Sequence, residues 1–168
     1  MTKIYTGVGS RSTPPDILKT IQDIAEFLAK KGWILRSGGA NGSDEAFEIG
    51  CDKANGKKEI YLPWLGFNDN KSKLLWPQPA WKIAEEIHPA WDKCSVNARC
   101  LHARNICQVL GSELDKPSSF LVCWTESGED IGGTATAIKL AKKHKVKVFN
   151  LGKKGDLTKL RNWCKKNA

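Results

Sequence analysis

A glycine-rich stretch at residues 35–47 carries the residue types best suited to bind an anion. Three glycines lie between positions 38 and 42, so the backbone there can adopt positive φ angles and approach a ligand closely. Ser43 or Asp44 can cap the helix that follows, and the free N–H groups and positive end of that helix would then point at a phosphate. A tight strand-to-helix turn without a ligand explains one such loop equally well. The phosphate hypothesis therefore needs a second loop.

Two further loops of this kind follow predicted strands. Residues 7–11 (Gly-Val-Gly-Ser-Arg) end one strand, and residues 125–134 follow another and end in Gly-Gly-Thr. Parallel strands bring their carboxyl ends to one edge of a sheet, where open α/β sheets bind ligands, so we expect the three loops to lie together. The chain contains neither a P-loop nor a G-x-G-x-x-G fingerprint, which argues against a P-loop ATPase and a conventional dehydrogenase.

The elements that position these loops alternate between short strands and helices. Strands are predicted at 3–8, 33–36, 59–62, 119–124 and 146–150, and helices at 13–31, 43–56, 97–110, 135–144 and 156–164. Such alternation indicates an α/β protein with a three-layer, Rossmann-like fold and a mainly parallel sheet of about five strands. We expect residues 1–168 to form a single nucleotide-binding domain, with the apolar strand 119–124 at the centre of the sheet.

Residues 64–96 interrupt this alternation with a tryptophan- and proline-rich excursion that holds at most one short helix, near 79–87. The excursion is expected to cover the carboxyl edge of the sheet, either as a lid with stacking residues or as a satellite hydrophobic cluster. A cluster is the favoured interpretation for most of its tryptophans. Trp64 is the exception, because it directly follows a strand and could stack on a base there.

Composition and charge narrow the class of protein further. The formal net charge is +9, and residues 142–168 hold ten Lys or Arg against one acid, Asp156. This basic end could attract nucleic acid, but a solvated basic face is the favoured interpretation. The six cysteines are irregularly spaced, which predicts free thiols with no metal site and no cofactor. The sequence has no membrane-spanning run and no signal peptide at its start, so we expect a cytoplasmic protein.

Four short motifs, in this order, resemble the DNA-processing protein A family and, more loosely, the LOG-type phosphoribohydrolases. The motifs are Gly9-Ser10-Arg11, Ser37-Gly38-Gly39-Ala40-Asn41-Gly42-Ser43-Asp44, Arg104-Asn105 and Gly132-Gly133-Thr134-Ala135-Thr136-Ala137. Both families belong to the SLOG group of Rossmann-like nucleotide binders. The resemblance implies that fold, a nucleotide ligand and a homodimer.

The activity that the resemblance implies is less complete in this sequence. The phosphoribohydrolases use an arginine and a glutamate to cleave an N-glycosidic bond; Arg104 matches the arginine, but Asn105 replaces the lysine that follows it, and no acid follows Thr134. The reaction needs a carboxylate near the developing oxocarbenium ion. A neighbouring loop could supply one from Glu45, Glu126, Glu129 or Asp130.

We therefore expect first a binder of a nucleotide or nucleotide-derived small molecule, similar to ADP-ribose or a cyclic nucleotide, that senses or sequesters this signal. In a virus, sequestration would blunt a host defence signal. The alternatives are a nucleoside-phosphate N-glycosidase and a single-stranded DNA binder, and weak, salt-sensitive nucleic-acid binding is expected in any case. Catalytic residues are not assigned. The expected ligand-binding residues are Gly9, Ser10, Arg11, Ser37, Gly38, Gly39, Ala40, Asn41, Ser43, Asp44, Trp64, Arg104, Asn105, Trp124, Gly132, Gly133 and Thr134.

Overall fold

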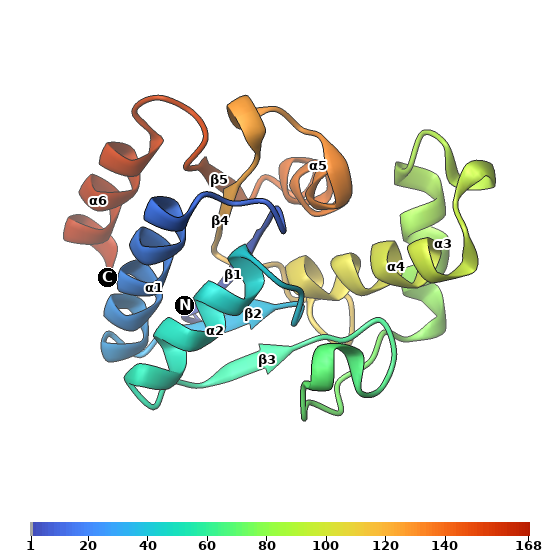
Figure 1. Cartoon of the computed structure of the whole chain (residues 1–168), viewed down its shortest axis with the longest axis horizontal. Coiled ribbons are helices and arrows are strands. Elements are labelled where there is room, and N and C mark those ends of the chain that lie inside the picture. The colour runs from blue at the N-terminus through green and yellow to red at the C-terminus, as the bar shows by residue number, and fades with distance from the viewer. Residues whose placement is uncertain (1) are drawn as a thin grey trace.

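Five parallel strands form the central sheet of the computed structural model, which describes residues 2–168 (Figure 1). The strands are β1 (Ile4–Gly9), β2 (Ile34–Ser37), β3 (Lys58–Ile60), β4 (Phe120–Trp124) and β5 (Lys147–Asn150), and their order in the sheet is β3-β2-β1-β4-β5. The helices are α1 (Pro15–Lys30), α2 (Ser43–Lys53), α3 (Gln78–Ile87), α4 (Val96–Leu110), α5 (Ala135–Lys143) and α6 (Asp156–Asn167). The predicted three-layer α/β fold is confirmed.

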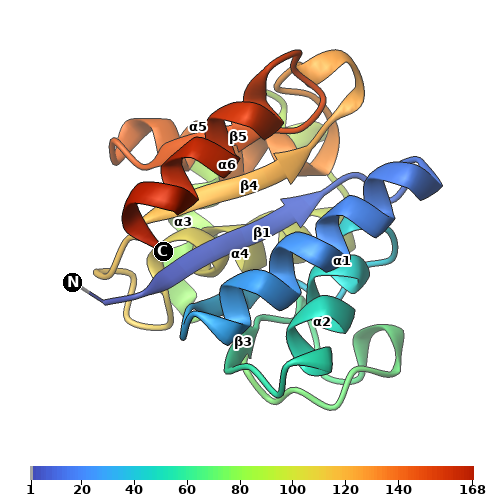
Figure 2. The ribbon, with the colours of Figure 1, turned by 90° about the vertical axis from the view of Figure 1, so that its left-hand side faces the viewer.

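Alternating side chains of the strands build a core on each face of the sheet. Tyr5 and Phe120 pack with residues of α1, α2 and α6 on one face, and Leu121 and Cys123 pack with α4 and α5 on the other. Figure 2 shows α1 and α6 in front of the strands. The strand β4 is buried on both faces, as its unbroken apolar sequence predicts, but it lies between β1 and the edge strand β5, and β1 holds the centre of the sheet.

The order of the strands defines a switch point between β1 and β4. These two strands are neighbours, with Gly9 opposite Trp124 at their carboxyl ends. From β1 the chain continues to β2 and β3 on one side, whereas from β4 it continues to β5 on the other. Open α/β sheets bind ligands in the crevice outside such a point.

Two glycines let α2 lie close to its neighbours. A Cβ atom at Gly7 would lie 2.6 Å from the ring of Phe47, and one at Gly50 would lie 2.2 Å from the carbonyl oxygen of Gln22 in α1. Each distance is far below a van der Waals contact. These residues fix the position of α2, whose N-terminus reaches the carboxyl edge of the sheet.

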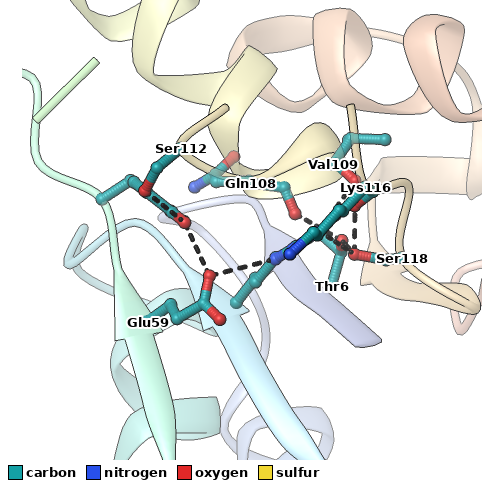
Figure 3. Close-up of polar contacts among 9 residues, drawn as sticks. Thr6, Glu59, Gln108, Val109, Ser112, Lys116 and Ser118 are labelled. Carbon is teal, nitrogen blue, oxygen red and sulfur yellow. Dashed lines mark hydrogen bonds and ion pairs between the residues drawn. The ribbon is translucent and has the colours of Figure 1, made fainter. Parts of the chain in front are cut away.

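A buried arginine joins β2 to the end of α4, and Figure 3 labels its partners Glu59, Val109 and Lys116. Arg36 is 2% exposed; its Nε donates to Glu59 Oε1 at 3.2 Å, and its Nη1 donates to the carbonyl oxygens of Val109 (3.2 Å) and Lys116 (2.6 Å). Thr6 continues the network, since its hydroxyl donates to the carbonyl oxygen of Gln108 at 2.6 Å. The chain segment that connects α4 to β4 is thus held against the sheet by polar contacts.

The tryptophans of the excursion at residues 64–96 mostly form a cluster. Trp81 packs against Trp76 (5.6 Å between ring centroids) and against Trp91 (5.3 Å), and α3 itself packs against α4. The short helix predicted near 79–87 is α3. Two 3-10 turns, Phe67–Asp69 and Trp91–Lys93, were not predicted.

The helix caps differ from the expected ones. Thr13 was the predicted cap of the first helix, but Pro14 holds the cap position before α1, and the Thr13 hydroxyl instead donates to the Ser10 carbonyl at 2.7 Å and shares a 2.6 Å hydrogen bond with Ser43. Gly42 holds the corresponding position before α2, since Ser43 is engaged with Thr13 and Asp44 lies one residue further along the helix. Among residues 2–168, no helix has the length and apolar character to cross a bilayer.

Candidate functional site

A cavity of about 740 Å³ opens at the switch point between β1 and β4. This volume falls within the range of about 300–1,000 Å³ that is usual for small-molecule sites. The wall is made of the loop after β1, the start of α2, one side of α4 and the loop between β4 and α5. Most of the predicted residues lie in it, namely Gly9, Ser10, Arg11, Ala40, Asp44, Arg104, Asn105, Trp124, Gly132, Gly133 and Thr134.

The remaining predicted residues lie outside the cavity wall: Ser37, Gly38, Gly39, Asn41, Ser43 and Trp64. Several of them hold the loops in place. The Ser37 hydroxyl donates to the Gly7 carbonyl at 2.6 Å, and a Cβ at Gly38 would lie 2.1 Å from Gln108 Nε2. Gly39 has φ +69°, and a Cβ there would lie 2.8 Å from Leu62 Cδ2, so its glycine serves the backbone and its packing.

The aromatic residue of the excursion that lines the cavity is Phe67. Trp64 lies outside the cavity wall, and its ring packs edge-on against Phe67 at 5.4 Å between centroids. Phe67 also lies beside Arg104 of α4, whose guanidinium is 5.7 Å from the ring centroid. Within the excursion, the aromatic ring at the cavity is thus that of Phe67 and not, as predicted, that of Trp64.

The loop before α5 offers open backbone at the cavity. Gly132 and Gly133 are exposed, and within residues 2–168 no heavy atom beyond their own chain neighbours lies within 4 Å of a Cβ built at either one. Gly132 has φ +69°, which favours glycine, whereas Gly133 shows no such backbone requirement. No side chain caps this end of the helix, and the first N–H groups of a helix have no partner within it. These amides can therefore bind an anion.

Arg104 is almost fully buried in the cavity wall. Its Nη1 donates to the carbonyl oxygens of Gly38 and, at 3.4 Å, Tyr61, and its Nε donates to Asn105 Oδ1 at 2.9 Å. Arg104 thus fixes the glycine loop, and the two N–H groups of its Nη2 remain without a partner among residues 2–168.

Asn105 connects this arginine to the loop before α5. While its Oδ1 accepts from Arg104, its Nδ2 donates to the carbonyl oxygen of Gly133 at 2.8 Å. A continuous series of hydrogen bonds therefore runs from Gly38 through Arg104 and Asn105 to Gly133. The loop after β1 is fixed separately, since Ser10 N–H donates to the Trp124 carbonyl at 3.1 Å.

Asp44 is a buried carboxyl group in the cavity wall. Burial raises the pKa of Asp44 to about 6, although the nearby Arg104 and the N–H of Ala40 (3.3 Å) oppose this shift. A carboxyl group with a pKa near neutrality in a cavity is a candidate acid or base. Of the carboxylates considered from the sequence, Glu126 lines the cavity, whereas Glu45, Glu129 and Asp130 do not.

Sequence reasoning missed Phe67 and His102 in the cavity wall. His102 lies three residues before Asn105 on α4, a spacing that places both on one helix face and could have predicted its position. Burial, with His88 and Arg104 nearby, lowers the pKa of His102 to about 4, so its ring is neutral at pH 7. Nothing in the sequence indicated that Phe67 would replace Trp64.

Together these features define a Rossmann-like α/β protein with a cavity at the switch point of its sheet. No family model and no curated protein matches the sequence. Solved structures do match. Two of these are structures of the molybdenum cofactor carrier protein of Chlamydomonas reinhardtii. One shares 20% identity with a TM-score of 0.55, and the match covers 98% of this chain and 84% of that chain. The other shares 22% identity with a TM-score of 0.56, and the match covers 95% of this chain and 82% of that chain.

DNA processing protein A of Streptococcus pneumoniae is also similar, with 15% identity and a TM-score of 0.54. The match covers 89% of this chain and 50% of that one, so the chain corresponds to about half of the pneumococcal protein. At these identities the likeness shows the fold. The Rossmann-like fold that the four motifs predicted, with its resemblance to DNA processing protein A, is thereby confirmed.

Proposed function

We propose that the protein binds a phosphate-bearing small molecule, a nucleotide or a nucleotide derivative, in the cavity at the switch point. The observation that carries this proposal is Gly133: neither its backbone conformation nor its packing requires glycine, yet it lies at a helix N-terminus beside the cavity. A missing side chain at that position leaves room for a ligand to approach the backbone.

The proposed ligand would place its phosphate at the N-terminus of α5. The N–H groups of Gly132 and Gly133 would donate to phosphate oxygens, and the helix dipole would favour the negative charge. Arg11 lines the same cavity, is exposed, and forms no ion pair within the described residues 2–168, so its charge is available to the phosphate. Phe67 and Trp124 would contact a flat ring.

A nucleoside-phosphate N-glycosidase is the second candidate, and Asp44 is the observation that favours it. Its pKa of about 6 suits a group that exchanges a proton near neutral pH, and it lies in the same cavity wall as Glu126. The ligand site would be the same as for a binder. Only the fate of the ligand separates the two functions.

A thermal-shift screen tests the proposal. The panel holds nucleotides, cyclic nucleotides, ADP-ribose and the molybdenum cofactor, which is included because two of the similar structures are carriers of it. A true ligand at 100 times its Kd should stabilise the protein by about 2.7 kcal/mol. Mass spectrometry of the recovered ligand then distinguishes binding from cleavage. If no member of the panel shifts the melting temperature at millimolar concentration, the proposal is wrong.

A further inference from the structure

We propose that His88, Cys94 and His102 form a binding site for Zn²⁺. The three residues come from separate segments: His88 follows α3, Cys94 follows the 3-10 turn at Trp91–Lys93, and His102 lies on α4. Their ligand atoms all lie within 4.8 Å of one another, and each residue is partly exposed, so an ion can reach them from solvent. The irregular spacing of the cysteines predicted no metal site. Cysteine spacing could not show this cluster, because two of its three ligands are histidines.

The distances within the cluster suit a small tetrahedral ion. Cys94 Sγ lies 3.9 Å from His88 Nδ1 and 3.8 Å from His88 Nε2, and the centroids of the two imidazole rings are 4.4 Å apart. With Zn–N bonds of about 2.0–2.1 Å and Zn–S bonds of about 2.3 Å, tetrahedral ligand atoms lie about 3.4–3.6 Å apart. The ligand atoms of all three residues lie within 4.8 Å of one another, so the proposed site needs side-chain rotations that draw them together by up to about 1 Å.

A neighbouring hydroxyl orients one of the ligands. His102 Nδ1 lies 2.8 Å from Thr136 Oγ1, so when Nδ1 carries the proton it donates to this oxygen and Nε2 presents its lone pair. Metal-binding histidines usually have such a partner for the second nitrogen. Thr136 is 2% exposed and belongs to α5, so the orientation is built into the packing of α4 against α5.

The second histidine has a competing contact. The N–H of Ala90 donates to His88 Nδ1 at 3.0 Å, so the neutral ring carries its proton on Nε2. When His88 binds the ion, it loses this hydrogen bond from Ala90. The loss lowers the affinity of the site, but His88 can still serve as a ligand.

The chemistry of the three ligands favours zinc. One thiolate and two neutral imidazoles form a ligand set that suits Zn²⁺, and three protein ligands leave a fourth position for water or another molecule. Packing alone is the competing explanation, since both histidine rings also lie near Trp91, at 6.4 and 6.5 Å between centroids. A bound ion would fasten the end of the excursion to α4, and through His102 it would lie at the wall of the ligand cavity.

Metal binding to the purified, chelator-treated protein tests the proposal without any ligand. The wild-type protein should bind about one equivalent of Zn²⁺ by elemental analysis, and Co²⁺ should give a thiolate charge-transfer band together with the visible bands of a tetrahedral ion. Cys94→Ser should lose the charge-transfer band, and His102→Gln should lose metal binding. The matched controls Cys100→Ser and His144→Gln change a cysteine and a histidine outside the cluster and should bind as the wild type does.

A further variant protects the test against misfolding of the ligand variants. Thr136→Val keeps the shape of the side chain and removes the hydroxyl that orients His102, so it should weaken Zn²⁺ binding by about 10- to 100-fold. Circular dichroism of each variant verifies the fold. A wild-type protein that binds no Zn²⁺ at micromolar concentration, or a Cys94→Ser protein that retains the charge-transfer band, would overturn the proposal.

Discussion

Substitutions of Gly133 should weaken ligand binding without lowering the stability of the fold. Gly133→Ala should leave the free energy of unfolding unchanged or raise it by about 0.4–1 kcal/mol, because the backbone tolerates a side chain and the unfolded chain loses freedom. The same change should weaken ligand binding, and Gly133→Val should weaken it further, as the side chain blocks the amides of the loop. Denaturant unfolding and isothermal titration measure the two effects. Equal affinity in all three proteins would place the ligand elsewhere.

Asp44 makes stability depend on pH. Since burial raises the pKa of Asp44 from 3.8 to about 6, the folded protein disfavours the carboxylate, and this contribution to stability is present below about pH 4 and lost as the pH rises through about 6. The pKa difference corresponds to about 3 kcal/mol. Asp44→Asn should therefore gain about that much over the wild type between pH 4 and pH 7, measured by urea unfolding. If the difference in unfolding free energy between Asp44→Asn and the wild type stayed constant with pH, the raised pKa of Asp44 would be contradicted.

The contact between α4 and the sheet depends on the buried arginine of β2. Arg36→Met should cost about 1–3 kcal/mol, because the Lys116 carbonyl loses its donor, whereas Glu59 still accepts from the Tyr61 hydroxyl and the Val109 carbonyl from Ser118 N–H. Glu59→Gln is the matched control: it retains an oxygen acceptor, and Glu59 is 30% exposed, so the loss should be smaller. Thermal or denaturant unfolding compares them. A similar cost for both would assign the stability to the ion pair and not to the carbonyl contacts.

The elements were predictable because their local patterns agree with the fold. Strand alternation, the proline at the start of α1 and the apolar run of β4 each indicate the observed element to within a few residues. The three loops were placed at one edge by the parallel pairing alone. A sequence shows which residues belong to a loop, and this was enough to bring Arg11 and Gly133 into one cavity, whereas Arg104, on α4, was predicted from the family resemblance.

Side-chain partners were less predictable, since they depend on contacts between distant segments. Thr13 forms a hydrogen bond with Ser43 instead of capping α1, and two nitrogens of Arg104 donate to Asn105 and Gly38 of the protein. The cluster of His88, Cys94 and His102 is assembled only when α3 packs against α4. The spacing of residues along the sequence does not predict such contacts between distant segments.

For the whole molecule, the basic C-terminal segment is separate from the cavity. The helix α6 packs on the sheet face that carries α1, whereas α4 lines the cavity from the opposite face. We expect weak oligonucleotide binding that fades near physiological salt, with a slope of log K against log salt of about −0.7 for each phosphate contacted. Charge reversal at Lys153, Lys154, Lys165 and Lys166 should abolish it and leave nucleotide affinity unchanged. Filter binding over a salt series measures it.

Tight oligonucleotide binding at physiological salt would rank the functions differently. If neither ADP-ribose nor cyclic nucleotides competed with the oligonucleotide, single-stranded DNA binding would become the first candidate.

The series of hydrogen bonds from Gly38 through Arg104 and Asn105 to Gly133 has a consequence for the kinetics of binding. Because both loops are ordered by α4 before any ligand arrives, the entropy of ordering them falls on folding and not on association. Association should then follow a single phase in stopped-flow fluorescence. Asn105→Ala frees the loop before α5, and a slow second phase should appear as that loop settles around its ligand.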